Sequence, residues 1–256
     1  MPDMPAAAED DEKMLQITTV GDTYNLGRKV GSGSFGEVYL VVDSTTGEEF
    51  AVKLEKAHAT RTSKLQNEAE VLKHLQGTTG IASMYLFCSE GDYNALVMDL
   101  LGPSLGELLK GCHRKFSLKT VLMIADQLLQ RLQYLHTKEL IHRDIKPENF
   151  AIGHGEMSKV IYMIDFGLAK TYREKKLERD LSGNESGSKS RRHHSSLTGT
   201  AQYASINAHT GQNQSCCDDL EATGYVLMYF LHGRLPWSSC KAPVKEEKYR
   251  MIMKIK

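Results

Sequence analysis

The segment that most constrains this chain runs from His142 to Asn149 and reads H-R-D-I-K-P-E-N. Six of its positions match the pattern H-R-D-x-K-P-x-N, which chance would produce on the order of 10⁻⁸ times per starting position. In such a pattern Asp144 can accept the proton of a hydroxyl group, Lys146 can neutralise a transferring phosphoryl group and Asn149 can hold a metal ion. The segment therefore predicts phosphoryl-transfer chemistry.

A second acidic motif, Asp165-Phe166-Gly167, follows further along the chain. The apolar residues from Ile161 to Ile164 predict a strand directly before it, so Asp165 should lie at a strand end. A carboxylate in that place is suited to bind a Mg²⁺ ion that bridges the β- and γ-phosphates of a nucleotide. D-F-G alone is a common tripeptide, and it indicates a metal site only because it follows the first segment.

A glycine-rich run with the pattern G-x-G-x-x-G-x-V lies near the start of the chain. The candidate nucleotide-binding residues here are Val30, Gly31, Ser32, Gly33, Ser34, Phe35, Gly36, Glu37 and Val38. Glycines let backbone N–H groups approach phosphate oxygens closely. The run alone fits a plain hairpin turn, and it also occurs in dinucleotide-binding oxidoreductases, where a helix follows it. Here residues that favour β-structure follow, which indicates a strand–loop–strand cap over a nucleotide.

One lysine, Lys53, stands in the apolar strand sequence Ala51-Val52-Lys53. Its distance along the chain from the glycine run suits a lysine that holds the α- and β-phosphates. Such a lysine needs a carboxylate to fix its position. Glu68 on the next expected helix is the candidate and Glu70 is the alternative, because helical spacing alone does not decide between them.

The order of the expected elements predicts an α+β fold with two lobes. Strands are expected over residues 24–55, 83–87 and 93–98, with a helix over 63–75 between them. Two strongly apolar helices are expected over 117–136 and 218–232, and a polar loop over 171–197. We therefore divide the chain into a disordered acidic tail (1–20), a small lobe (21–99) and a large lobe (100–256).

The composition is that of an ordinary globular protein, with 41% hydrophobic and 25% charged residues. The formal net charge is zero, so no global field favours nucleic acid or an anionic membrane.

The five cysteines form no C-x-x-C pair, which argues against a zinc site or a disulfide framework. No apolar run reaches the length of a membrane span and the first residues do not form a signal peptide, so we expect a cytoplasmic protein that can also be nuclear.

With these motifs together, the chain resembles the eukaryotic protein kinases, and among them the casein kinase 1 family. The lysine two positions after Asp144 is typical of the serine/threonine class. The residues from Leu100 to Leu105, L-L-G-P-S-L, resemble the hinge of casein kinase 1. Ser205-Ile206-Asn207 stands where most kinases have Ala-Pro-Glu, as is typical of that family. The resemblance covers about residues 22 to 250 and implies a two-lobed kinase fold that uses ATP and Mg²⁺ to phosphorylate protein substrates.

The resemblance also implies roles for single residues. Met98 would be the gatekeeper beside the adenine pocket, and Asp99 and Leu101 would present backbone groups to adenine. Thr200 would contact Asp144 and help to select a hydroxyl acceptor. Asp219 would brace the catalytic loop, although a helix N-cap is an equally good interpretation from the sequence.

The family favours sites near acidic or phosphorylated residues, and the chain departs in part from its basic pocket. Arg143 and Lys248 match two residues of that pocket, but Gln202 stands where the family has an arginine. Cys216-Cys217 replaces a pair of arginines before the core helix. The loop 171–197 is longer than usual; its basic residues either restore positive charge near the substrate or simply form a solvated loop.

The resemblance implies a kinase domain that continues well past Tyr249, so we expect a large lobe that is incomplete at its C-terminal end. The helix over 218–232 is apolar on all sides, and we expect it to lose part of its cover, to destabilise the chain and to promote self-association of an otherwise monomeric protein. The main hypothesis is an active serine/threonine kinase. The alternative is a catalytically weak, kinase-like scaffold.

Overall fold

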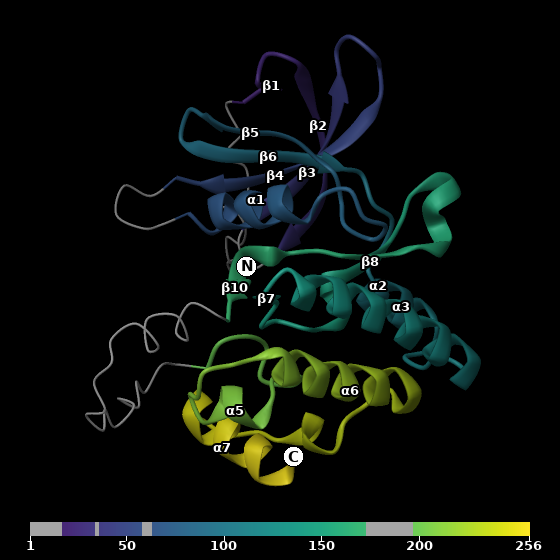
Figure 1. Cartoon of the computed structure of the whole chain (residues 1–256), viewed down its shortest axis with the longest axis vertical. Coiled ribbons are helices and arrows are strands. Elements are labelled where there is room, and N and C mark those ends of the chain that lie inside the picture. The colour runs from purple at the N-terminus through teal and green to yellow at the C-terminus, as the bar shows by residue number, and fades with distance from the viewer. Residues whose placement is uncertain (1–16, 34–35, 58–62, 173–196) are drawn as a thin grey trace, which may run out of the picture.

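The small lobe of the computed structural model is a six-stranded antiparallel sheet (Figure 1). The structure describes residues 17–33, 36–57, 63–172 and 197–256. The strands lie in the order β1-β2-β3-β4-β6-β5. Their bounds are β1 Thr19–Val20, β2 Tyr24–Gly33, β3 Gly36–Asp43, β4 Glu49–Lys56, β5 Met84–Glu90 and β6 Tyr93–Asp99. The antiparallel meander expected from the β-favouring residues is confirmed.

The two faces of β4 have different environments because side chains alternate along a strand. Val52 and Leu54 point into a small apolar cluster together with Val41 and Val97. Lys53 points to the opposite face, toward the helix α1 (Lys64–Leu75). The alternation thus puts Lys53 on the face of the sheet that packs against α1.

Helix α1 begins where the sequence predicted, because Ser63 caps it by accepting a hydrogen bond from the backbone N–H of Gln66 at 3.0 Å. Leu65, Leu72 and Leu75 are buried under the sheet. Fully burying each such side chain contributes roughly 1.5–3 kcal/mol to stability. The helix therefore has a fixed orientation, which decides what its polar residues can contact.

The large lobe is mainly helical and lies below the sheet in Figure 1. Its helices are α2 Leu105–Gly111, α3 Leu118–Thr137, α5 Ile206–His209, α6 Cys216–His232 and α7 Lys245–Ile255. Its short strands are β7 Leu140–Ile141, β8 Phe150–Ile152, β9 Ile161–Met163 and β10 Lys170–Thr171. Four 3₁₀ turns complete its described part: η1 Pro147–Asn149, η2 Gly155–Lys159, η3 Phe166–Leu168 and η4 Pro236–Ser239.

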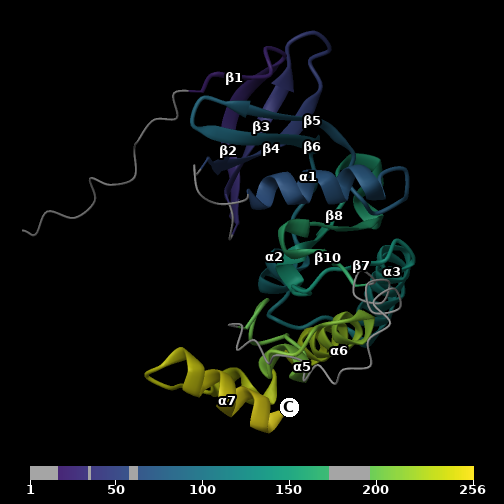
Figure 2. The same cartoon turned by 60° about the vertical axis from the view of Figure 1, so that its left-hand side comes forward.

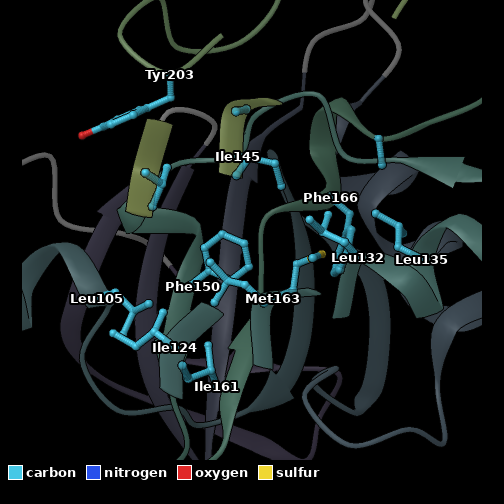
Figure 3. Close-up of a cluster of buried hydrophobic side chains, with 14 of the residues drawn as sticks. Leu105, Ile124, Leu132, Leu135, Ile145, Phe150, Ile161, Met163, Phe166 and Tyr203 are labelled. Carbon is cyan, nitrogen blue, oxygen red and sulfur yellow. The ribbon is translucent and has the colours of Figure 1, made fainter. Parts of the chain in front are cut away.

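One apolar core joins α1, α3 and α6. Figure 3 shows part of it, including Phe150 on β8 and Met163 on β9, which lie close to the two motifs in the sequence, and Phe166, which belongs to the second motif. All three side chains are fully buried. The two segments found in the sequence therefore lie on a rigid base.

The helix expected over 218–232 begins two residues earlier, at Cys216. Ser215 caps it, and its partner in a capping box is Asp218. Cys216-Cys217 thus forms the first turn of the helix and does not precede it, which corrects our expectation.

The apolar residues of α6 divide into two sets. Val226 and Phe230 are fully buried in the core, whereas Leu220 and Met228 are 45% and 47% exposed. The helix carries apolar residues on all sides, as expected. Partly buried residues of α6 also pack against the core, namely Tyr225, Leu227, Tyr229 and Leu231, so its exposed apolar side is the one with Leu220 and Met228.

The tail expected over residues 1–20 ends earlier than predicted. Thr19–Val20 pairs with β2, and Val20 is fully buried, because its branched side chain fills the small apolar cluster of the sheet. Residues 1–16 lie outside the described part, as do residues 173–196 of the expected loop. In the described residues, no helix is both long enough and apolar enough to cross a membrane.

Candidate active site

The glycine-rich run forms the end of a hairpin between β2 and β3. Gly31 pairs with Val38, and Gly33 pairs with Gly36. Gly36 has φ +158°, and a Cβ atom there would lie 2.2 Å from the carbonyl oxygen of Leu54, so only glycine fits. A strand follows the run and no helix does, which agrees with a nucleotide cap and not with a dinucleotide-binding fold. Ser34 and Phe35, which come between Gly33 and Gly36 in the sequence, lie outside the described residues.

Lys53 lies where the small lobe meets the large lobe, a region called the cleft below, and two carboxylates surround its ammonium group. Its Nζ is 2.6 Å from Oε2 of Glu68 and 3.1 Å from Oδ1 of Asp165. The structure therefore decides the open choice of partner, because Glu70 lies on the exposed side of α1 and accepts from Gln66 at 3.3 Å. The three side chains come from β4, α1 and the segment after β9, and only folding brings them together.

Burial acts on all three groups of this cluster, and it raises the pKa of Glu68 against the attraction of Lys53. Burial disfavours the cation, but Glu68 and Asp165 outweigh it and raise the pKa of Lys53. Burial also acts on Asp165, yet attraction to Lys53 holds the pKa of that carboxyl below its ordinary value. One ammonium group thus faces two carboxylates, and Asp165 is ionised and suited to ligate a divalent cation.

The backbone at Asp165 is in the left-handed region, with φ 63° and ψ 67°. A non-glycine residue keeps such a conformation only where its surroundings enforce it. Neighbouring residues of α1 do so: the carboxylate of Glu68 accepts from the backbone N–H of Phe166, and Nδ2 of Asn67 donates to the carbonyl oxygen of Phe166 at 3.3 Å. Sequence reasoning missed Asn67, since nothing in its neighbourhood marks it as functional.

The second group of functional residues surrounds Asp144, which is 6% exposed. Nζ of Lys146 lies 2.6 Å from its Oδ2, and Oγ1 of Thr200 donates to its Oδ1 at 2.8 Å. Nδ2 of Asn149 donates to the backbone carbonyl oxygen of Asp144 at 2.8 Å. The contact expected between Thr200 and Asp144 is therefore confirmed, although the two residues are far apart in the sequence.

Asp219 holds the backbone of this loop from below. Its carboxylate accepts from the N–H groups of His142 at 2.9 Å and Arg143 at 3.0 Å. Nε2 of His136 on α3 lies 2.9 Å from the same carboxylate. The bracing role is confirmed and the N-cap alternative is wrong, because Ser215 is the cap of α6. The contribution of His136 was not visible in the sequence.

The residues expected around adenine lie at the end of β6. Met98 pairs with Ala51 of β4, which places it on the same face of the sheet as Lys53. The carboxylate of Asp99 accepts from the backbone N–H of Ser83 and from the hydroxyl of Tyr85, both at 2.7 Å. The backbone N–H of Asp99 donates to the carbonyl oxygen of Ser83 at 3.1 Å, so this N–H is already used within the protein. Leu101 follows in the connection to the large lobe.

The residues expected for an anion pocket are not joined to one another. Nε of Arg143 donates to the carbonyl oxygen of Leu168 at 2.7 Å, and burial lowers the pKa of this guanidinium group. Gln202 donates to the hydroxyl of Tyr203 at 3.3 Å, and Lys248 is exposed on α7. Within the described part of the chain, no hydrogen bond or ion pair links Arg143, Gln202 and Lys248. A pocket built from them would need a bound anion to bring them together.

The chemistry of the donors fits a nucleotide-bound magnesium ion better than a metal held by protein alone. In the described ranges, no group of three or more His, Cys, Asp or Glu side chains could hold a metal. Asp165 and Asn149 offer one carboxylate and one amide oxygen, since the amide nitrogen of Asn149 is already used. Mg²⁺ prefers such a sparse set of protein oxygens completed by phosphates and water.

Comparison with known families agrees with this arrangement. A family model described as "Protein kinase domain" matches residues 24–256. The match extends from β2 to the last residue, and so includes both lobes and every residue of the cleft described above.

Proposed function

The chain belongs to the protein kinase family, and on that premise we propose that it is a serine/threonine kinase of the casein kinase 1 type that prefers acidic or phosphorylated sites. As a protein kinase it transfers a phosphoryl group from ATP to protein substrates. The class of acceptor, the type and the site preference are the parts we propose.

The cleft residues divide the work of such a transfer. Lys53, fixed by Glu68, would hold the α- and β-phosphates. Asp144 would orient the acceptor hydroxyl and take its proton, while Lys146 would neutralise charge on the transferring group. Mg²⁺ at Asp165 and Asn149 would neutralise phosphate charge when bound.

The single observation that carries the proposal is the position of Thr200 and Lys146 on the two oxygens of Asp144, at 2.8 and 2.6 Å. This arrangement fixes the orientation of the Asp144 carboxylate, which would accept the proton of an acceptor hydroxyl, and puts a cation beside it. The lysine at this place favours a serine or threonine acceptor over tyrosine.

The environment of Ser205 supports the casein kinase 1 type. Its side chain caps α5 and donates to Oδ1 of Asp218 at 2.6 Å, and it is 2% exposed. Ser205 thus has a structural role at the place where most kinases carry the first residue of Ala-Pro-Glu. Ile206 next to it donates its backbone N–H to Glu221, which ties the same segment to α6.

Two basic residues that match the family's anion pocket support the proposed site preference. Arg143 precedes Asp144 directly, and Lys248 is exposed on α7. Gln202 adds no charge, so the preference should be weaker than in relatives that have an arginine there.

A peptide array tests the proposal. We expect ATP-dependent labelling of serine and threonine peptides with acids or phosphate upstream of the acceptor, and none in an Asp144→Asn variant, which cannot take the proton. Equal labelling of tyrosine peptides would contradict the acceptor class. Labelling no stronger than in Asp144→Asn would favour the kinase-like scaffold.

A further inference from the structure

The side chain of Lys256, at the end of α7, lies in an aromatic box under the segment Thr200–Ala204. Its Nζ is 4.7 Å from the ring centre of Tyr225 and 5.1 Å from that of Trp237. It donates to the carbonyl oxygen of Ala201 at 3.2 Å and also to that of Ala204. Figure 2 shows α7 at the bottom of the large lobe, beneath α5 and α6.

Side chains donate to the carbonyl groups on the lower side of this segment. Nε1 of Trp237 donates to the carbonyl oxygen of Gln202 at 2.8 Å. Nε2 of His209 lies 3.1 Å from the carbonyl oxygen of Ala201, which Lys256 also contacts. Three backbone carbonyl groups of one short segment thus receive donors from α5, η4 and the end of α7.

The upper side of the same segment meets the catalytic loop. Oγ1 of Thr200 donates to Asp144, and the N–H groups of Tyr203 and Ala204 both donate to the carbonyl oxygen of Thr200 at 2.9 Å. Gly199 fits closely, since a Cβ atom there would lie 2.4 Å from the carbonyl oxygen of Arg143. A shift of the Lys256 contacts would therefore be transmitted to Thr200.

The ammonium group itself, more than the bulk of the side chain, fits this site. Among the described residues, no carboxylate lies within ion-pair distance of Lys256. Its charge is balanced by two carbonyl dipoles and two aromatic faces, which attract a cation. An apolar side chain would fill the same box without the cost of burying a charge, but it would leave the carbonyl oxygens of Ala201 and Ala204 without this donor.

We propose that Lys256 is a positioning residue whose ammonium group holds the segment Thr200–Ala204, and with it Thr200, in the place where a serine or threonine acceptor is presented to Asp144. This inference rests on the proposed acceptor class. It predicts that loss of the charge weakens the use of the protein substrate and leaves ATP binding unchanged.

The titration of Lys256 predicts a pH dependence that tests the proposal independently of any substitution. Burial lowers the pKa of Lys256 to about 8, with Glu221 on α6 opposing the shift. The other groups that face it are His209 on α5, whose pKa is lowered by burial and by Lys256, and Tyr225 on α6, whose pKa is raised by burial. Tyr203 in the segment has a raised pKa for the same reason, and Tyr249 on α7 packs on His209.

The effect of pH on stability and on activity should therefore have opposite signs. Between pH of about 8 and the ordinary value of 10.5, the unfolded chain holds a proton at Lys256 that the folded chain has lost. This group then makes the fold more stable as pH rises. If Lys256 has only a structural role, its deprotonation in this pH range should not lower activity. If it positions the segment, deprotonation weakens its hydrogen bonds to the two carbonyl groups, and activity should fall.

The test compares Lys256→Met with Lys254→Met, a control on the same helix whose side chain is exposed. We expect Lys256→Met to lower kcat/KM for a serine peptide about tenfold and to change KM for ATP less than twofold, with Lys254→Met like the wild type. Amide exchange should show lower protection of residues 200–204 only in Lys256→Met. Peptide kinetics within twofold of the wild type would overturn the proposal.

A pH series tests this pH dependence in the wild type even where Lys256→Met fails to fold. Between pH 7 and 9.5 we expect kcat/KM for the peptide and the protection factors of residues 200–204 to fall, while the melting temperature does not. Unchanged protection over this range would overturn the proposal. Exchange needs no catalysis, so a wild type that labels no peptide but loses protection would contradict the proposed function and keep the positioning role.

Discussion

The two charged clusters of the cleft are built in different ways. The cluster around Lys53 consists of ion pairs between side chains of both lobes, from β4, α1 and the segment after β9. The cluster around Asp219 lies within the large lobe, and its carboxylate is bonded to backbone N–H groups of the catalytic loop. The position of the acceptor side of the cleft therefore depends on the large lobe alone. The phosphate side forms only when α1 and the sheet are correctly placed against the large lobe.

The largest effect should come from removing a charge on the phosphate side. Lys53→Met and Asp165→Asn should each lower kcat/KM by roughly 100-fold or more, because a lost electrostatic group in such a site typically costs ~3 kcal/mol or more. The melting temperature should change little. Turnover and thermal melting measured together check this.

The matched control is Lys56→Met, on the same strand but exposed. It should behave like the wild type. Near-normal turnover in Lys53→Met or Asp165→Asn would show that these residues do not have the phosphate and metal roles. It would also contradict the larger effect on activity expected for the phosphate side.

On the acceptor side, Asp219→Ala should reduce stability as well as activity. It leaves the N–H groups of His142 and Arg143 without their acceptor, at about 1–3 kcal/mol for each buried group. Denaturant unfolding measures the free energy of unfolding. A variant that loses activity with unchanged stability would show that the brace is not needed to hold the loop.

Glu68→Gln sharpens the comparison within α1. It keeps the size of the side chain but removes the charge that holds Lys53, so we expect a fall of about tenfold in kcat/KM for ATP, or ~1.4 kcal/mol. Glu70→Gln is the control two residues further on, with its side chain exposed. Steady-state kinetics at varied ATP distinguish them, and equal effects in both would contradict the pairing seen here.

The smallest effect is expected at the acceptor side, in Gln202→Arg. An arginine can bind a phosphate group through two hydrogen bonds, but Gln202 is partly exposed, so a gain of about 3- to 10-fold in preference for phosphorylated peptides is expected. The ratio of kcat/KM on paired phosphorylated and unphosphorylated peptides measures it. An unchanged ratio would indicate that no anion binds beside residue 202.

Much of the fold was predictable because its signals are local. The helix from Lys64 starts after Ser63, and the strand ending at Met163 starts at Ile161, both as expected. Errors occurred where tertiary packing acts on short segments: Val20 is buried by the sheet although its neighbours in the sequence are polar, and α6 includes Cys216-Cys217 because Ser215 caps it.

The sequence by itself determined which chemical groups this protein carries, since the motifs around Asp144 and Asp165 name them by local pattern. Tertiary structure alone decided which groups meet. Glu68 and Glu70 differ by two positions, and only the packing of α1 turns one of them to Lys53. Asn67, His136 and Lys256 likewise act through residues distant in the chain. Such contacts depend on how faces of separate elements pack, and a local pattern contains no information on that.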